Sequence, residues 1–145
     1  MNGFHFTDRG NAVNEDFAYA GALPGGGAYG VAIDGATGLV EMPLVSPGFS
    51  TNAQWFSHTV GAALCEALES GTAPEQALAH AVTIACAELE SALSCPAGSL
   101  DPVAVPSATL ALAVVGEKNV ELWGLGDSPI VALMRDGGLV VSTDE

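Results

Sequence analysis

The sequence predicts an α+β domain in which an antiparallel β-sheet buries one face against an antiparallel pair of helices. Two observations predict this fold class. Short apolar runs bounded by turn residues lie in both the first and the last third of the 145-residue chain. Between them, apolar residues recur at helical spacing over a long central stretch. Because strands, then two helices, then strands again follow one another, we expect one sheet packed on a helix pair.

The first two strands form a predicted hairpin. Two apolar runs, Phe17–Ala20 and Tyr29–Ile33, are separated by Leu23–Gly27, a segment that can turn but can hardly form regular structure. Together with Gly30, this segment also matches the three-glycine pattern of a dinucleotide-binding loop. That pattern has to open a helix, whereas a strand-like run follows it here, so we interpret the segment as a hairpin turn.

The first helix is predicted to begin after the capping candidates Ser50, Thr51 and Asn52 and to end before Gly71, which suits a left-handed closing position. Its span corresponds to about five turns. Apolar residues recur every four positions along it: Phe56, Val60, Leu64 and Leu68.

The second helix is predicted to begin at a capping box, Thr72 with Glu75, with Pro74 in its first turn, and to stop before Pro96. The connection to the first helix is short, so the two helices are expected to lie antiparallel. The apolar positions of this helix are Leu78, Val82, Ala85 or Cys86, Leu89 and Leu93.

The last third of the chain predicts a meander of short antiparallel strands. It follows a connection rich in Pro, Gly and Ser at residues 94–106. The predicted strands are Thr109–Val115, Val120–Leu125, Ile130–Met134 and Leu139–Val141.

The charge balance excludes several classes of partner. Seventeen acidic residues against three basic ones give a net charge of −14, which repels the phosphate backbone of nucleic acids and anionic membrane surfaces. Cations are favoured by the same charge. An acidic surface also serves simply to keep a protein soluble, so charge alone names no ligand.

The cysteines indicate a reducing compartment. Cys65, Cys86 and Cys95 are odd in number and lack the paired spacing of a zinc site or a redox motif, so we interpret them as buried thiols. No apolar run reaches the ~20 residues that a membrane helix needs, and the start lacks a signal-peptide pattern. We therefore expect a cytoplasmic protein.

Four acidic residues stand where predicted strands begin or end, namely Glu15, Asp16, Asp34 and Asp127. Glu15 and Asp16 are adjacent, so in an extended backbone their side chains leave on opposite faces and cannot form a simple acid/base pair. A hard divalent cation such as Mg or Mn suits this geometry, because it accepts oxygen ligands directly and through water. The alternative readings are turn residues for Asp34 and Asp127 and solvated acids for the adjacent pair.

The order of short segments resembles the type 2C metal-dependent protein phosphatases, which act on phosphoserine and phosphothreonine. The segments are Asn14–Phe17, Val31–Gly35, Ser107–Leu110, Leu122–Ser128 and Asp136–Leu139, the last followed by Ser142–Glu145. The resemblance covers nearly the whole chain, from about Thr7 to Glu145, with the predicted helix pair between the second and third segments.

The resemblance implies a β-sandwich flanked by helices, with a binuclear Mg or Mn centre that activates a water molecule. Asp34 would bridge both ions, the Gly35 carbonyl would bind one and Glu15 the other. Asp16 would support the water shell, and Asp127 would correspond to the ligand of a third ion. Such a centre lowers the pKa of water and neutralises charge on the attacking and leaving oxygens.

The sequence also departs from that family. The Arg that holds the substrate phosphate is replaced by Asn11, and Arg9, two residues earlier, would serve only if the loop is rearranged. Ala36 stands where many members carry a His that donates a proton. His58 and His80 lie in the predicted helices and are interpreted as packing or surface residues.

The family's domain is longer than this chain, and two of its metal-binding Asp residues have no counterpart here. We therefore expect residues 1–145 to form a single, incomplete phosphatase-like domain, either the N-terminal portion of a longer enzyme or a shortened relative. The expected activity is weak or absent hydrolysis of a phosphoprotein substrate. The alternatives are a non-catalytic binding, regulatory or oligomerising module, and an α+β domain whose acidic turns match by chance.

A shortened sandwich would leave apolar sheet surface and open strand edges uncovered. The mean hydropathy of +0.38 agrees with such a surface. We therefore expect a homo-oligomer that associates through the exposed sheet.

Overall fold

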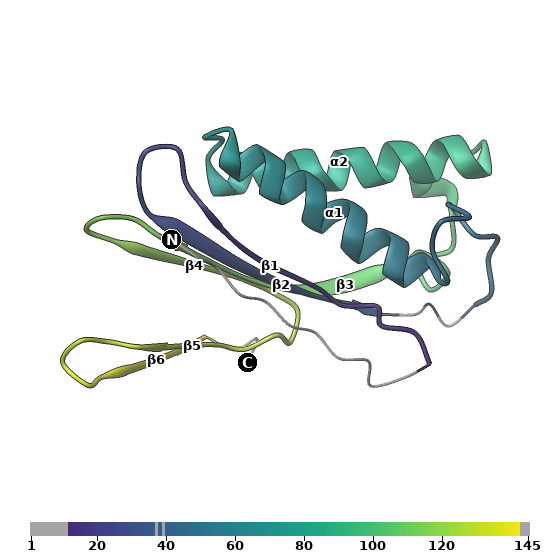
Figure 1. Ribbon diagram of the computed structural model, residues 1–145. Helices are drawn as coiled ribbons and strands as arrows, with labels where there is room; N and C mark the ends of the chain where they lie inside the picture. The colour runs from purple at the N-terminus through teal and green to yellow at the C-terminus, as the bar shows by residue number, and fades with distance from the viewer. Residues whose placement is uncertain (1–11, 37, 39, 143–145) are drawn as a thin grey trace.

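The computed structural model describes residues 12–36, 38 and 40–142 of the chain, and it is an α+β fold, as predicted. Figure 1 labels the elements. In chain order they are β1 (Phe17–Ala22), β2 (Ala28–Ala36), α1 (Asn52–Glu69), α2 (Pro74–Leu93), the short 3-10 helix η1 (Ala97–Ser99), β3 (Ser107–Val115), β4 (Val120–Leu125), β5 (Ile130–Leu133) and β6 (Leu139–Ser142).

Four strands form one antiparallel sheet in the order β1-β2-β3-β4. The segment Leu23–Gly27 is the turn of the β1–β2 hairpin, as predicted, because the Leu23 N–H donates to the Gly27 carbonyl and the Gly26 N–H donates to the Leu23 carbonyl. Both helices are inserted between β2 and β3, which are nonetheless neighbours in the sheet.

The predicted four-strand meander is wrong in one respect. β5 and β6 pair only with each other and form a separate two-stranded sheet. The chain leaves the main sheet at Gly126, which has a left-handed φ of +73°. Pro129 follows and has no backbone N–H to continue a ladder. The hairpin therefore lies below the main sheet and does not extend it (Figure 1).

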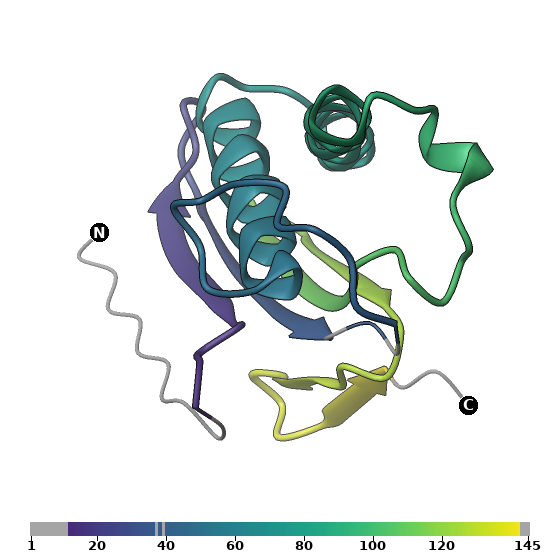
Figure 2. The ribbon, with the colours of Figure 1, turned by 90° about the vertical axis from the view of Figure 1, so that its right-hand side faces the viewer.

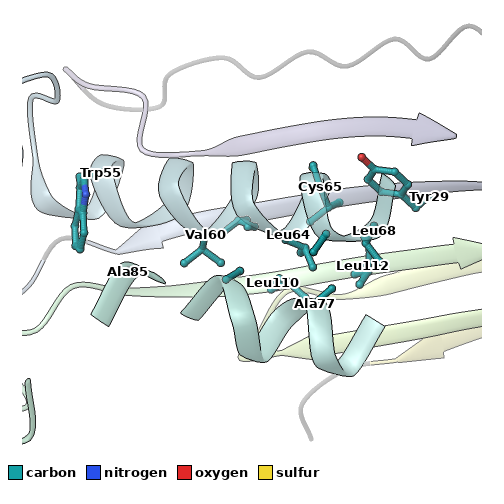
Figure 3. Close-up of a cluster of buried hydrophobic side chains, with 14 of the residues drawn as sticks. Tyr29, Trp55, Val60, Leu64, Cys65, Leu68, Ala77, Ala85, Leu110 and Leu112 are labelled. Atoms are coloured by element: carbon teal, nitrogen blue, oxygen red, sulfur yellow. The ribbon is translucent and has the colours of Figure 1, made fainter. Parts of the chain in front are cut away.

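Both helices lie on one side of the main sheet and run in opposite directions (Figures 1 and 2). α1 packs directly on β1, β2 and β3, whereas α2 packs chiefly on α1. An apolar core lies between the helices and the sheet, and Figure 3 shows part of it. It includes Tyr29, Val31 and Ile33 of β2, Leu110 and Leu112 of β3, and Trp55, Leu64 and Leu68 of α1.

The ends of α1 confirm the predicted caps. Thr51 is the N-cap, and its hydroxyl accepts a 3.0 Å hydrogen bond from the Gln54 N–H. At the other end, Gly71 has a φ of +89° and donates to the Leu68 carbonyl, while the Thr72 N–H donates to the Ala67 carbonyl. This pair of bonds is a Schellman motif that closes the helix.

The predicted capping box of α2 is wrong. The N-cap of α2 is Ala73, which makes no side-chain capping bond, and Pro74 takes the first helical position. Thr72 lies one residue before the N-cap, and its backbone N–H closes α1, so this N–H is not free to donate to the Glu75 side chain, the return contact that a capping box needs.

The apolar face of α2 also differs from the prediction. Val82 is 38% exposed, whereas the buried residues of α2 are Ala77, Ala81, Ala85 and Leu89. A row of alanines at four-residue spacing lets α1 approach closely, so the small residues face the core. Of the cysteines, Cys65 is buried while Cys86 and Cys95 are partly exposed, and all three thiols are free.

The face of the sheet away from the helices is made of small residues. A cleft of about 460 Å³ lies between this face and residues 129–131, and it is lined by Ala18, Ala20, Ala32, Ala111 and Ile130, among others. Exposed apolar side chains continue over the hairpin: Val131, Leu133, Met134, Leu139, Val140 and Val141. Among the helices of the described residues, none is both long and apolar enough to cross a membrane.

Candidate functional site

Two carboxylates meet at the end of the sheet where β1 begins and β2 ends. In the β1–β2 ladder Phe17 pairs with Ile33, so the register continued by one residue places Asp16 opposite Asp34. The charge of Asp34 acts on the Asp16 carboxyl and contributes to raising its pKa. We call Asp16 and Asp34 the acid pair.

Glu15 points to the opposite side of the sheet, as adjacent residues in an extended backbone must. Its carboxylate accepts a 2.6 Å hydrogen bond from the hydroxyl of Thr51, the N-cap of α1. The structure thus agrees with the sequence analysis that Glu15 and Asp16 leave the chain on different faces. Glu15 is nevertheless near enough for its charge to act on Asp16.

The pKa of Asp16 is raised above its ordinary value. Partial burial is the largest cause, followed by the charge of Asp34 and the hydrogen bond to it, and then by the charge of Glu15. Each effect disfavours the ionised form of Asp16. Three acidic side chains therefore gather at this end of the sheet, where a bound cation would favour the ionised form of Asp16.

Gly35 brings the sheet into close contact with both the acidic segment and α1. A Cβ atom at this position would lie 2.7 Å from the Glu15 carbonyl oxygen and 2.8 Å from the Ala53 carbonyl oxygen. Both oxygens belong to the backbone and cannot move aside easily. Glycine is required here because three backbone segments meet at one point.

Three side chains of α1 hold the segment that carries Glu15 and Asp16. Their donors reach three successive backbone carbonyls, those of residues 14, 15 and 16. Gln54 Nε2 donates to Asn14 at 3.1 Å, Ser57 Oγ to Glu15 at 2.5 Å, and His58 Nε2 to Asp16 at 3.1 Å.

Sequence reasoning missed this role of α1, and it treated His58 as a packing or surface residue. One available signal was the spacing of Gln54, Ser57 and His58, polar residues at i, i+3 and i+4 that share one face of an otherwise largely apolar helix. Ser57 is fully buried, with none of its surface exposed.

Asp127 lies near the acid pair but is not joined to it by a described contact. Thr109 of β3 pairs with Asp34 of β2. On its other side, a Cβ atom at Gly126 would lie 2.7 Å from Thr109 Cγ2, and the Ser128 and Thr109 hydroxyls are hydrogen-bonded. The exposed Asp127 therefore belongs to the same end of the sheet.

The donor set fits a hard divalent cation in part. Asp16, Asp34 and the Gly35 carbonyl offer oxygen ligands, which Mg and Mn prefer, and the pKa of Asp16 is raised by burial and then by the neighbouring acids. Within the described ranges, no group of three or more His, Cys, Asp or Glu side chains is arranged as a ready metal site.

The predicted phosphate-binding residues Arg9 and Asn11 lie outside the described residues. The two basic residues of the described part, Lys118 and Arg135, lie in the turn between β3 and β4 and in the turn between β5 and β6. Both turns are at the end of the molecule opposite the acid pair (Figure 1). Neither residue therefore serves as a phosphate clamp beside Asp34.

Comparison with known proteins identifies relatives of this fold. The profile of the family described as "Protein phosphatase 2C" matches residues 7–145. Among solved structures, a bacterial serine phosphatase bearing an Arg-to-Glu mutation is similar, with a TM-score of 0.58 and 18% identity over 98% of this chain. The present chain spans 59% of the length of that phosphatase. No curated protein matches the sequence significantly.

Proposed function

Because the chain belongs to the protein phosphatase 2C family, we propose that its acid pair takes part in metal-dependent hydrolysis of phosphoserine or phosphothreonine in a phosphoprotein. The single observation that carries this proposal is the β1–β2 register, which places Asp16 opposite Asp34 at one end of the sheet, where the charge of Glu15 also acts on Asp16. The order of the carboxylates along the sequence, Glu15, Asp16, Asp34 and Asp127, supports the proposal because it is the order in the segments that resemble the family.

Each acidic residue has a role in this proposal that its position supports. Asp34 would be the central ligand, because it stands on a sheet strand paired on both sides and is therefore held rigidly. The Gly35 carbonyl and Glu15 would complete the ligands, and Asp16 would accept hydrogen bonds from the water shell. Asp127 would supply a further carboxylate from the neighbouring turn.

When bound, Mg or Mn ions would lower the pKa of a water molecule and neutralise charge on the phosphate oxygens. The chain's own contribution is to hold the carboxylates at fixed positions. The described residues offer no cation beside the acid pair for binding the substrate phosphate, so we propose that hydrolysis by these 145 residues is slow.

A phosphate-release assay tests this function. Purified protein is incubated with a phosphothreonine peptide in Mn or in EDTA, beside Asp34→Asn and the matched control Glu117→Gln, an exposed acid in the turn between β3 and β4. We expect Mn-dependent release of inorganic phosphate by wild type and the control, with loss of release in Asp34→Asn. Release that is equal in all three proteins would contradict the proposal, because it would not depend on Asp34.

One observation favours a second function, a non-catalytic binding module. The part of the chain that the structure describes holds no ready group of three metal-binding side chains. A chain that binds Mn through Asp34 but releases no phosphate would be such a module, whereas Mn-dependent release excludes it.

A further inference from the structure

We infer that Gln54, Ser57 and His58, here called the α1 clamp, are positioning residues that set the directions of the Glu15 and Asp16 carboxylates for cation binding. This inference rests on the proposed function, since it names what orients the proposed ligands. None of the three side chains needs to touch a cation or a substrate for this role. They act on the backbone of residues 14–16.

The acidic segment needs such a support because it lies outside the sheet. The β1–β2 ladder begins at Phe17, so residues 14–16 precede it, and the Asp16 N–H donates to Asn14 Oδ1 at 3.1 Å. Their three carbonyls accept instead from the α1 clamp, at 3.1 Å, 2.5 Å and 3.1 Å. Because a carbonyl oxygen only accepts hydrogen bonds, His58 Nε2 carries the hydrogen in this contact.

Three successive fixed carbonyls determine two side-chain directions. Each carbonyl belongs to a planar peptide unit, and Glu15 and Asp16 each lie between two of these units. When the planes on both sides of a residue are fixed, its φ and ψ angles are fixed, and so is its Cα–Cβ bond. The three clamp contacts therefore fix the Cα–Cβ direction from which each carboxylate starts, and the χ angles of each side chain set the rest.

The clamp residues are themselves held in place. The Gln54 side-chain oxygen accepts a 2.9 Å bond from the Ser50 N–H, which leaves its amide nitrogen for Asn14. The His58 ring lies between two aromatic rings, those of Phe17 at 5.7 Å and Phe49 at 5.8 Å between centroids. Ser57 is fully buried. Each donor is thus oriented before any ligand arrives.

The N-terminal part of α1 contacts the Glu15 carboxylate as well as the backbone held by the clamp. Thr51, one residue before the helix, donates to the Glu15 carboxylate itself, and the clamp begins three residues later. The first two turns of α1 therefore contact both the backbone and a side chain of the acidic segment.

The test measures, for each variant, both the affinity for Mn and the backbone rigidity of residues 15–17. Wild type is measured beside Ser57→Ala/His58→Ala, the conservative variant His58→Gln, and Thr83→Ala, which removes a hydroxyl-to-carbonyl bond of 2.8 Å elsewhere, on α2. Calorimetry with Mn alone gives the Kd. Backbone ¹⁵N relaxation of metal-free protein gives the order parameters of residues 15–17, at a temperature where circular dichroism shows every variant folded.

We expect the double variant to bind Mn about 10–100-fold more weakly than wild type, in the range found for groups that orient ligands. Its order parameters in residues 15–17 should fall from about 0.85 toward 0.6 or lower. His58→Gln should keep most of the affinity because its amide can donate to the same carbonyl, and Thr83→Ala should behave as wild type.

The outcomes separate the two claims. If wild type binds Mn and the double variant binds it equally well, the positioning role is overturned while the proposed function stands. If wild type does not bind Mn, the proposed function fails. The order parameters of residues 15–17 then still show whether the α1 clamp holds the acidic segment. Unchanged order in the double variant would overturn the clamp whether or not Mn binds.

Discussion

Asp16 and Asp34 are brought together by the register of one hairpin. The last ladder pair of β1 and β2 is Phe17 with Ile33, so the two acids face each other one position further along. Neither acid has a described basic neighbour, and the charge of Asp34 disfavours the ionised form of Asp16. An arrangement that repels itself in the absence of a ligand is typical of a functional site.

The acid pair predicts that metal-free protein becomes more stable when one charge is removed. The pKa of Asp16 is raised in the folded state, so folding disfavours its ionised form and costs stability above that pKa. As the pH falls through the raised pKa toward the unfolded value of about 3.8, this cost disappears. We therefore expect Asp16→Asn in EDTA to melt at a higher temperature than wild type at pH 7. The gain should shrink as the pH is lowered through the folded pKa, and a variant that melts lower at pH 7 would contradict this.

Gly35 predicts a steric effect at the same place. Gly35→Ala puts a Cβ atom 2.7 Å from the Glu15 carbonyl oxygen, so the acidic segment or α1 has to shift. We expect a loss of about 1–3 kcal/mol in the free energy of unfolding, measured by urea denaturation. Gly30→Ala is the matched control on the same strand, because its Cβ atom would meet nothing within 4 Å. Equal effects of the two substitutions would refute the close contact.

Tyr29 predicts a stability effect that is independent of the site. Its hydroxyl donates a 2.8 Å hydrogen bond to Glu69 Oε1, and the ring is buried in the core. The pKa of Tyr29 is raised, chiefly by burial and then by Cys65 and Glu69, so the hydroxyl stays protonated as a donor. Tyr29→Phe should lower the free energy of unfolding by about 1 kcal/mol, as measured by thermal melting. An unchanged melting temperature would mean that the bond contributes nothing.

The exposed β5–β6 hairpin predicts self-association of the protein. All four residues of β6 are exposed, and Leu133 of β5 is 74% exposed. An isolated hairpin with apolar side chains and open edges is a template for pairing with a second copy. We expect sedimentation velocity to show association that increases with concentration and is lost in Leu133→Lys/Leu139→Lys. A wild-type monomer at all concentrations would count against it.

Local patterns predicted much of the fold. The hairpin turn and the caps of α1 depend on neighbours in sequence, and the structure confirms their places, whereas Asp34 lies two residues before the end of β2. The predictions were wrong where contacts between residues far apart in the sequence determine the local structure. Thr72 closes α1 and does not cap α2. On α2 the buried face is formed by a row of alanines and not by Val82. After β4 the chain leaves the main sheet at Gly126, so β5 does not join it.

The candidate site was only partly predictable for the same reason. The acids could be identified because their residue types and positions limit their chemistry. The α1 clamp could not, because its contacts join side chains to backbone carbonyls about 40 residues away in the chain. Such contacts leave only a weak pattern in the sequence, namely polar residues on one face of an apolar helix.

Calorimetric titration of Mn into wild type and Asp34→Asn tests the central claim most directly. A dication that depends on the carboxylate of Asp34 should bind wild type saturably and should lose most of its affinity for the variant. Glu117→Gln, at the other end of the sheet, should retain wild-type affinity. Equal binding to wild type and Asp34→Asn, or no binding to either, would contradict the assignment of the acid pair as a cation site.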